Sequence, residues 1–274
     1  MTRQYRTARG NQPIVMKKMT SYTFLLLILT ITPAYSLDPF NYTVNVKNFN
    51  EEIYRQKTSR FRLVSSDQGF SLAENRRQSV TRSMLKDGRK ILDIRTGEAG
   101  RGTDRPPSGE EYLNDARFLN LASPEISGAA SRLGKAKDPV RAVEAFVYRH
   151  ISTKTLGIPL AAAAQVYRMK SGDCTEHSIL SVALLRKLGV PARAIVGMYL
   201  ADDFLGNKNV FVYHMWAEAY QNGSWRLVDA TRPGGAGLNR YIAFAEHNLR
   251  AEAPLPYLRA ISAIQDLTVE YLGK

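Results

Sequence analysis

One cysteine, Cys174, occurs in the chain, and its position indicates what its thiol does. A lone cysteine cannot form an intramolecular disulfide, and many single cysteines are simply small buried hydrophobic residues. Cys174 begins a largely apolar stretch that runs to Leu188 and is followed by Gly189 and Pro191, a pattern that predicts a buried helix. At the start of a helix, unpaired backbone N–H groups and the helix dipole favour a thiolate. We therefore expect Cys174 to be a nucleophile.

A thiol nucleophile needs a base, and the chain offers four histidines: His150, His177, His214 and His247. Asn222-Gly223 lies between two strand-like runs and predicts a two-residue hairpin turn. Counting back from this turn puts Asp229 diagonal to His214 on one face of the hairpin, about 7–8 Å away at the backbone, within reach of a hydrogen bond. In this prediction Cys174 attacks an amide carbonyl, His214 transfers the proton and Asp229 orients the imidazole.

The oxyanion of such a reaction needs two hydrogen-bond donors. The backbone N–H of Cys174 is one candidate. For the second donor the candidates are the side chains of Gln165 and Tyr167, each of which is otherwise an ordinary helix residue. Trp216 is expected beside His214, either as an aromatic wall for substrate or as packing within the sheet.

Four short segments resemble a known family in residue type, order and spacing. They are Gly172-Asp173-Cys174-Thr175-Glu176-His177, Leu188-Gly189-Val190-Pro191-Ala192-Arg193, Tyr213-His214-Met215-Trp216-Ala217-Glu218 and Trp225-Arg226-Leu227-Val228-Asp229-Ala230-Thr231. Together they look like the core of the transglutaminase-like superfamily in its bacterial form, over about Asp138 to the C-terminus. The resemblance implies a papain-like arrangement, in which the helix carrying Cys174 packs on an antiparallel sheet that carries His214 and Asp229.

The same resemblance implies a cysteine-dependent peptidase or amidase that forms a thioester and uses no cofactor. Animal transglutaminases have Gln and Trp beside the nucleophile where this chain has Asp173 and Thr175, so a protein-glutamine transglutaminase forming isopeptide bonds is the alternative enzyme. A non-catalytic binding module on the same fold is a third reading. Zinc bound by Cys174, His177 and the predicted base and acid is disfavoured, because the chain has no second paired motif, and we expect no metal.

The fold class expected is α+β, with a small β-rich segment before the catalytic core. Short runs of alternating apolar residues recur between Phe40 and Arg95 and predict strands. Residues 97–109 are rich in glycine and proline and predict a linker. Beyond it, Asp138-Pro139 predicts the start of an amphipathic helix. The predicted division is therefore 37–110 for the β-rich segment and linker, and 111–274 for the transglutaminase-like catalytic domain.

Residues 1–36 have the pattern of a secretory signal peptide. Basic residues precede an apolar run from Phe24 to Ile31, and Ala34-Tyr35-Ser36 is a small-x-small cleavage site. A run of this length is too short to span a bilayer. We expect cleavage after Ser36 and an exported protein, periplasmic or extracellular, with an uncleaved N-terminal anchor as the alternative. Translation from Met16 or Met19 would give a more compact leader.

The chain is basic, with a net charge of +13, of which five charges lie in the leader and +8 remain. The substrate expected is therefore a protein or peptide, and a positive surface suits an anionic or cell-wall-linked one, although a charged surface also serves solubility. Export and the absence of a recognisable nucleic-acid-binding motif exclude nucleic acid as the expected partner. Contact with the membrane is expected only in transit, through the signal peptide.

Overall fold

The computed structural model describes residues 43–98, 104, 107, 110–155, 161–235, 237–249 and 262–274. All of these belong to one compact unit, Asp38–Lys274. The predicted signal peptide, residues 1–36, lies outside the described residues. Within the described part of the chain, no helix is both long and apolar enough to cross a bilayer.

A nine-stranded sheet is the largest element of the described chain. Eight of its strands lie side by side in the order β10 (Tyr241–His247), β7 (Ala192–Phe204), β8 (Asn207–Gln221), β1 (Thr43–Lys47), β11 (Thr268–Gly273), β2 (Thr58–Ser65), β4 (Arg89–Gly97) and β3 (Gln78–Lys86). The ninth, β9 (Ser224–Val228), pairs with β8. Within this sheet the pairs are antiparallel except for β1 and β11, which run parallel.

The hairpin of β8 and β9 has the register that the sequence predicted. Asn222 and Gly223 both have positive φ, 55° and 78°, which is the backbone of the turn that Asn-Gly favours. The strands then pair Gln221 with Ser224 and, three residues back, Glu218 with Leu227. The turn chemistry therefore sets which side chains of β8 and β9 share a face.

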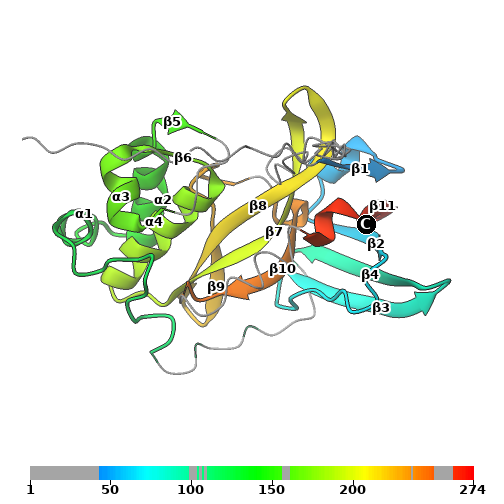
Figure 1. Cartoon of the computed structure of the whole chain (residues 1–274), viewed down its shortest axis with the longest axis horizontal. Helices are drawn as coiled ribbons and strands as arrows, with labels where there is room; N and C mark the ends of the chain where they lie inside the picture. Colours follow the sequence, from blue (N-terminus) through cyan, green and yellow to red (C-terminus); the bar gives the residue numbers. More distant parts are fainter. Residues whose placement is uncertain are drawn as a thin grey trace, which may run out of the picture. The chain divides into compact units, whose positions relative to one another are not determined.

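Four helices cover one part of the sheet (Figure 1). They are α1 (Pro124–Leu133), α2 (Pro139–His150), α3 (Ala163–Met169) and α4 (Cys174–Lys187). Asp138 caps α2 as predicted, since its side chain accepts a hydrogen bond from Arg141 N–H at 3.1 Å. Short elements complete the described chain: the 3₁₀ helices η2 (Glu51–Tyr54) and η3 (Leu238–Arg240) and the parallel pair β5 (Thr153–Lys154) and β6 (Ser171–Gly172).

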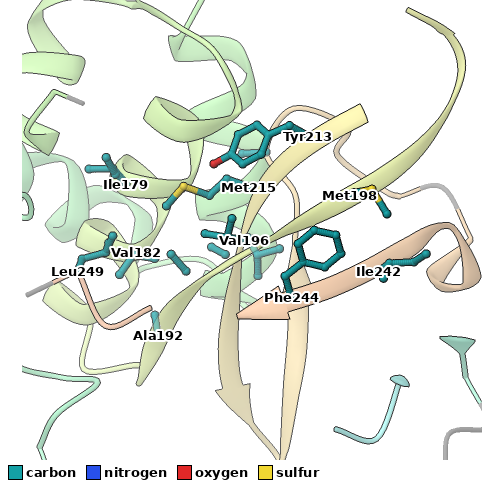
Figure 2. Packing of buried hydrophobic residues seen from close by; sticks show 14 of the residues in the cluster. Ile179, Val182, Ala192, Val196, Met198, Tyr213, Met215, Ile242, Phe244 and Leu249 are labelled. Carbon is teal, nitrogen blue, oxygen red and sulfur yellow. The ribbon is translucent and has the colours of Figure 1, made fainter. Parts of the chain in front are cut away.

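Helix α4 is buried over almost its whole length, from Thr175 to Arg186, and its buried residues include polar side chains in the first turns as well as the apolar ones that follow. Its side chains Ile179 and Val182 pack beside Met215 and Tyr213 of β8, which point toward the helix (Figure 2). The expected fold class is confirmed: the chain is a mixed α+β protein in which α4, with Cys174 at its first residue, packs on a large antiparallel sheet.

The strands before residue 98 join the same sheet as the strands that follow the predicted linker. Buried polar groups tie the two parts together. Gln78 donates from Nε2 to Ala243 O at 2.7 Å and accepts at Oε1 from Ala243 N at 2.8 Å, and Asn239 Nδ2 donates to Ser59 Oγ at 2.9 Å. The predicted boundary between a β-rich segment, residues 37–110, and a catalytic domain, residues 111–274, stays a prediction. In the structure, strands from both segments belong to one sheet.

Candidate active site

Strand β8 has a short unpaired edge, and the candidate site forms there. On one side β8 pairs with β7 from Asn207 to Ala219. On its other side β8 pairs with β1 at residues 210–212 and with β9 at residues 217–221. Residues 213–216 therefore have no strand on that side among the described residues. At such an edge, backbone N–H groups that have no partner strand can donate hydrogen bonds to another group.

Cys174 is the first residue of α4, and the cap of that helix holds it in place. The Asp173 side chain accepts from the N–H of Thr175 at 2.8 Å and also from the N–H of Glu176, while Glu176 Oε2 accepts from Asp173 N–H at 3.0 Å. This reciprocal capping box satisfies the donors around Cys174 but not its own N–H, which has no acceptor among the described residues. This free N–H is the group that the sequence predicts as an oxyanion donor.

Gly172 lets the chain turn into this cap. Its φ of +156° lies where L side chains are rare, and a Cβ added there would stand 2.4 Å from Cβ of Glu176. The close approach brings β6 against the first turn of α4, which carries the cysteine.

His214 and Asp229 meet across the β8–β9 hairpin. Nε2 of His214 lies 2.7 Å from Oδ2 of Asp229, and both side chains are buried. The diagonal relation deduced from the turn therefore does produce the hydrogen bond. Because Nε2 is engaged with the carboxylate, Nδ1 is the ring nitrogen left to exchange a proton with a nucleophile.

Both carboxylate oxygens of Asp229 are fully used. Oδ1 accepts from Thr231 N–H at 3.0 Å and from the Thr231 hydroxyl at 2.6 Å, and Oδ2 accepts from the Tyr241 hydroxyl at 2.8 Å in addition to His214. Burial alone raises the pKa of Asp229, but the charge and hydrogen bond of His214 and the two hydroxyl donors outweigh it and lower that pKa. Burial and the adjacent carboxylate raise the pKa of Tyr241, which keeps its hydroxyl a donor.

Cys174 and His214 line the same pocket, of about 350 Å³. Its wall is completed by Lys154, Thr155, Gly172, Asp173, His177, Tyr199, Phe204, Val212, Tyr213, Thr231 and Arg232. The volume is in the range of pockets that bind small molecules or short peptide segments. Among the described residues, no hydrogen bond joins the cysteine sulfur to the imidazole of His214.

The environment of Cys174 raises the pKa of its thiol, contrary to the expectation from the helix terminus. Burial is the largest cause, and the carboxylate of Asp173 adds to it, while a hydrogen bond from the backbone N–H of Met215 acts in the opposite direction. The Met215 N–H belongs to the unpaired edge of β8, so the sulfur sits at that edge. Cys174 is therefore a neutral thiol until a base removes its proton.

His177 holds a lysine in the pocket wall rather than acting on the thiol. Its Nδ1 lies 2.6 Å from the carbonyl oxygen of Asp173, to which it donates, and its Nε2 accepts from the Lys154 ammonium at 2.6 Å. Burial, followed by the charge of Lys154, lowers the pKa of His177 to about 4. The imidazole is thus neutral at neutral pH. Burial and the nearby Asp173 raise the pKa of Glu176, one residue earlier, to about 7.

The three less certain candidates lie apart from the pocket. Gln165 is exposed on α3. Tyr167 packs against the His150 ring at 4.3 Å between centroids, and its hydroxyl contacts Arg132. Trp216 is buried and stacks beside His214 at 6.0 Å between ring centroids. Neither Gln165 nor Tyr167 reaches the pocket wall, and Trp216 supports the imidazole from within the sheet.

Sequence reasoning missed Tyr241, Lys154 and Arg232. Tyr241 is brought to Asp229 by β10, which pairs with β7 and has no local motif. Lys154 belongs to β5, whose pairing with β6 places it opposite Gly172. Of these three residues, only Arg232 had a signal in the sequence, because it directly follows Thr231, the last residue of the motif that contains Asp229.

No group of three or more metal-ligating side chains comes together in the part of the chain that the structure describes. His177 and His214 are each engaged elsewhere, with Lys154 and Asp229 respectively. A larger hollow of about 780 Å³ near β9, whose lining includes four arginines and three acidic residues, contains none of the predicted catalytic residues.

Residues 123–230 match the model of a family described as the transglutaminase-like superfamily. This stretch contains the predicted nucleophile, base and acid. No curated protein is similar enough in sequence to be a match.

Several solved structures are similar in shape. A candidate cysteine protease from Cytophaga hutchinsonii has 16% identity and a TM-score of 0.48, with 85% of this chain and 83% of that chain covered. The periplasmic domain of TgpA from Pseudomonas aeruginosa has 19% identity and a TM-score of 0.46, with coverage of 69% and 75%. Red sea bream transglutaminase has 11% identity and a TM-score of 0.35, with coverage of 65% and 46%. At these values the similarities carry no inference about activity.

We expect Gly172→Ala to destabilise the protein by about 2 kcal/mol, because the added methyl overpacks against Glu176. Urea unfolding measures the change. Gly128→Ala is the matched control: Gly128 lies within α1 and its added Cβ would find no atom nearer than 3.7 Å, so a gain of about 0.5–1 kcal/mol is expected. Equal effects of the two substitutions would contradict the crowding at Gly172.

His177 should make the fold sensitive to acid. Its pKa is about 4 in the folded protein against an ordinary 6.5, so its contribution to stability is fully present above pH 6.5 and is lost as the pH falls toward 4. The loss amounts to about 3 kcal/mol. His177→Gln should lose correspondingly less stability over this range, measured as urea midpoints at several pH values. A variant with the same pH dependence as the wild type would show that His177 is not the titrating group.

Proposed function

We propose that this chain, whose residues 123–230 belong to the transglutaminase-like superfamily, is a cysteine-dependent acyl-transfer enzyme that cleaves amide bonds of proteins or peptides. In this proposal Cys174 is the nucleophile, His214 the general base and acid, and Asp229 the residue that orients the imidazole. The intermediate is a thioester on Cys174.

The observation that carries the proposal is the hydrogen bond of 2.7 Å between His214 and Asp229, in a pocket that Cys174 also lines. A carboxylate whose oxygens accept four hydrogen bonds is held in one orientation, and it fixes the imidazole in turn. If His214 and Asp229 had only a structural role, His214 would not need to line the pocket that contains Cys174, the single cysteine of the chain.

The first step is proton transfer together with attack. Because burial and Asp173 raise the pKa of the thiol, Cys174 gives its proton to Nδ1 of His214 as Sγ bonds to the carbonyl carbon of the substrate. The imidazolium that forms is stabilised by Asp229, whose own pKa is lowered by the same contact. A neutral resting thiol also protects the only cysteine from unselective oxidation.

The second step breaks the amide. The negatively charged oxygen of the former carbonyl accepts a hydrogen bond from the free N–H of Cys174, at the positive end of the α4 dipole. The imidazolium returns its proton from Nδ1 to the departing nitrogen, so an amine leaves and the acyl group stays on sulfur. Water then adds to the thioester with His214 as base, and the carboxylic acid departs as the thiol is restored.

Export of the protein is part of the proposal. The supporting feature is the basic, apolar and small-residue order of residues 1–36. The substrates proposed are therefore proteins or wall-linked peptides outside the cytoplasm. N-terminal sequencing of the secreted product, with Leu37 as the expected first residue, tests the export step.

A screen of peptides, isopeptides and wall fragments, read by mass spectrometry, tests the reaction. We expect Cys174→Ala to abolish turnover with the fold intact, and His214→Ala to lower kcat/KM about 10³-fold or more, because such residues act as a unit. A labelled amine added to the same mixtures separates hydrolysis from transfer: amine incorporation in place of hydrolysis would favour the transglutaminase. Full activity of Cys174→Ala would refute the proposal.

Tyr241→Phe should lower kcat about three- to tenfold with little change in KM, because the Asp229 carboxylate loses one hydrogen bond and holds the imidazole less firmly. Tyr271→Phe is the matched control. Its hydroxyl donates to Gln56 at 3.0 Å, outside the pocket, so the same atom is removed without an effect on kcat. Equal kinetics of the two variants would show that Tyr241 does not position Asp229.

A further inference from the structure

Two cations line the candidate active-site pocket without an acidic partner. Lys154 and Arg232 both belong to the wall of the 350 Å³ pocket that contains Cys174. Neither forms an ion pair within the described structure. The acidic group of the same wall is Asp173, whose carboxylate is committed to the N–H groups that cap α4. The charge that faces the pocket is therefore positive.

Lys154 is held in one position with one donor to spare. Its ammonium donates to Ile151 O at 3.0 Å and to His177 Nε2 at 2.6 Å. An ammonium has three N–H donors, so the third is available to the pocket. Partial burial of the ammonium lowers the pKa of Lys154, although the residue as a whole is exposed to solvent, and no carboxylate forms an ion pair with it among the described residues.

His177 explains how this position is maintained. Its Nδ1–H donates to the carbonyl oxygen of Asp173, which fixes the tautomer and leaves Nε2 as an acceptor for Lys154. The same carbonyl belongs to the residue before Cys174. His177 is thus a positioning residue that ties the lysine to the start of the nucleophile helix.

Arg232 stands over another part of the wall. Its guanidinium carbon lies 4.2 Å from the centre of the Tyr199 ring, and Tyr199 itself lines the pocket. A guanidinium held over a ring face by cation–π attraction still has N–H donors that can bind an anion such as a carboxylate. Apolar contacts from Phe204 and Val212 complete the wall.

We propose that the pocket selects amide substrates that carry a carboxylate close to the scissile bond, and that Lys154 and Arg232 bind this carboxylate. The inference rests on the proposed function, since it names the substrate class of that site. An acidic peptide segment or a peptide with a free terminal carboxylate has this chemistry. Asp173 lies on the same wall and opposes binding, but two unpaired cations outweigh one capped carboxylate.

The single cysteine allows a test that needs no substrate. Iodoacetate and iodoacetamide alkylate the same sulfur and differ chiefly in the negative charge. We expect the ratio of their rate constants, iodoacetate over iodoacetamide, to fall about tenfold in Lys154→Gln and in Arg232→Gln relative to the wild type. Lys154→Arg should keep most of the ratio. Lys135→Gln removes the same charge at an exposed position outside the pocket and should leave the ratio unchanged.

A binding measurement in Cys174→Ala protein makes the test independent of thiol reactivity. Calorimetry compares acetyl-alanyl-glycine with its C-terminal amide, and acetyl-alanyl-glutamate amide with the corresponding glutamine peptide. The first pair tests a terminal carboxylate and the second a side-chain carboxylate. We expect the acid of at least one pair to bind about tenfold more tightly than its neutral partner, and the preference to vanish when Lys154→Gln is added.

The outcomes separate the two proposals. The carboxylate site is refuted if the ratio of iodoacetate to iodoacetamide rate constants is equal in the wild type and the variants. It is also refuted if none of the four peptides binds, or if the acids bind no more tightly than their neutral partners. Either result holds even if amide hydrolysis is found. A clear carboxylate preference in a protein that cleaves no amide leaves the anion site standing and counts against the proposed reaction.

Discussion

The structure depends on a short interruption in strand pairing along β8. Strand β1 covers this side of β8 only to residue 212, and β9 covers it only from residue 217, so four residues in between keep an open edge. The cysteine sulfur occupies this edge, where it receives the backbone N–H of Met215. A continuous ladder would have satisfied that N–H and excluded the start of α4. The opening is therefore what allows a helix and a hairpin to share one pocket.

Around this opening, buried polar groups are paired so that each side chain has one role. Asp229 accepts four hydrogen bonds and cannot rotate away from His214. Asp173 and Glu176 cap the helix and leave the N–H of Cys174 free. His177 bonds to Asp173 O and Lys154, so it has no proton to exchange with the thiol. Of the two histidines in the pocket wall, only His214 keeps a ring nitrogen without a hydrogen-bond partner among the described residues.

Burial shifts the pKa values of the groups around the pocket, upward for acids and downward for bases. It raises the pKa of Cys174 and of Glu176, and it lowers that of His177 and of Lys154. The pKa of Asp229 stays low because its interactions with His214 and its hydrogen bonds from Thr231 and Tyr241 exceed its burial penalty. The pocket wall accordingly contains a neutral thiol, a buried neutral histidine, His177, and two cations that have no carboxylate partner among the described residues.

Local patterns in the sequence determined the start of α4 at Cys174, the Asn222-Gly223 turn and, through its register, the meeting of His214 with Asp229. The helix start, the turn and the hairpin register each depend on residues within about twenty positions of one another. Helix-capping residues and the two-residue period of strands are enough to predict them. Only the tertiary structure decided that the thiol pKa is raised, that Tyr241 holds Asp229, that Lys154 and Arg232 face the pocket, and that Gln165 and Tyr167 do not. Each of these follows from strands or loops distant in sequence, such as β10 beside β7 and β5 beside β6. Desolvation and long-range pairing arise from the packed chain as a whole, and no short stretch of sequence contains them.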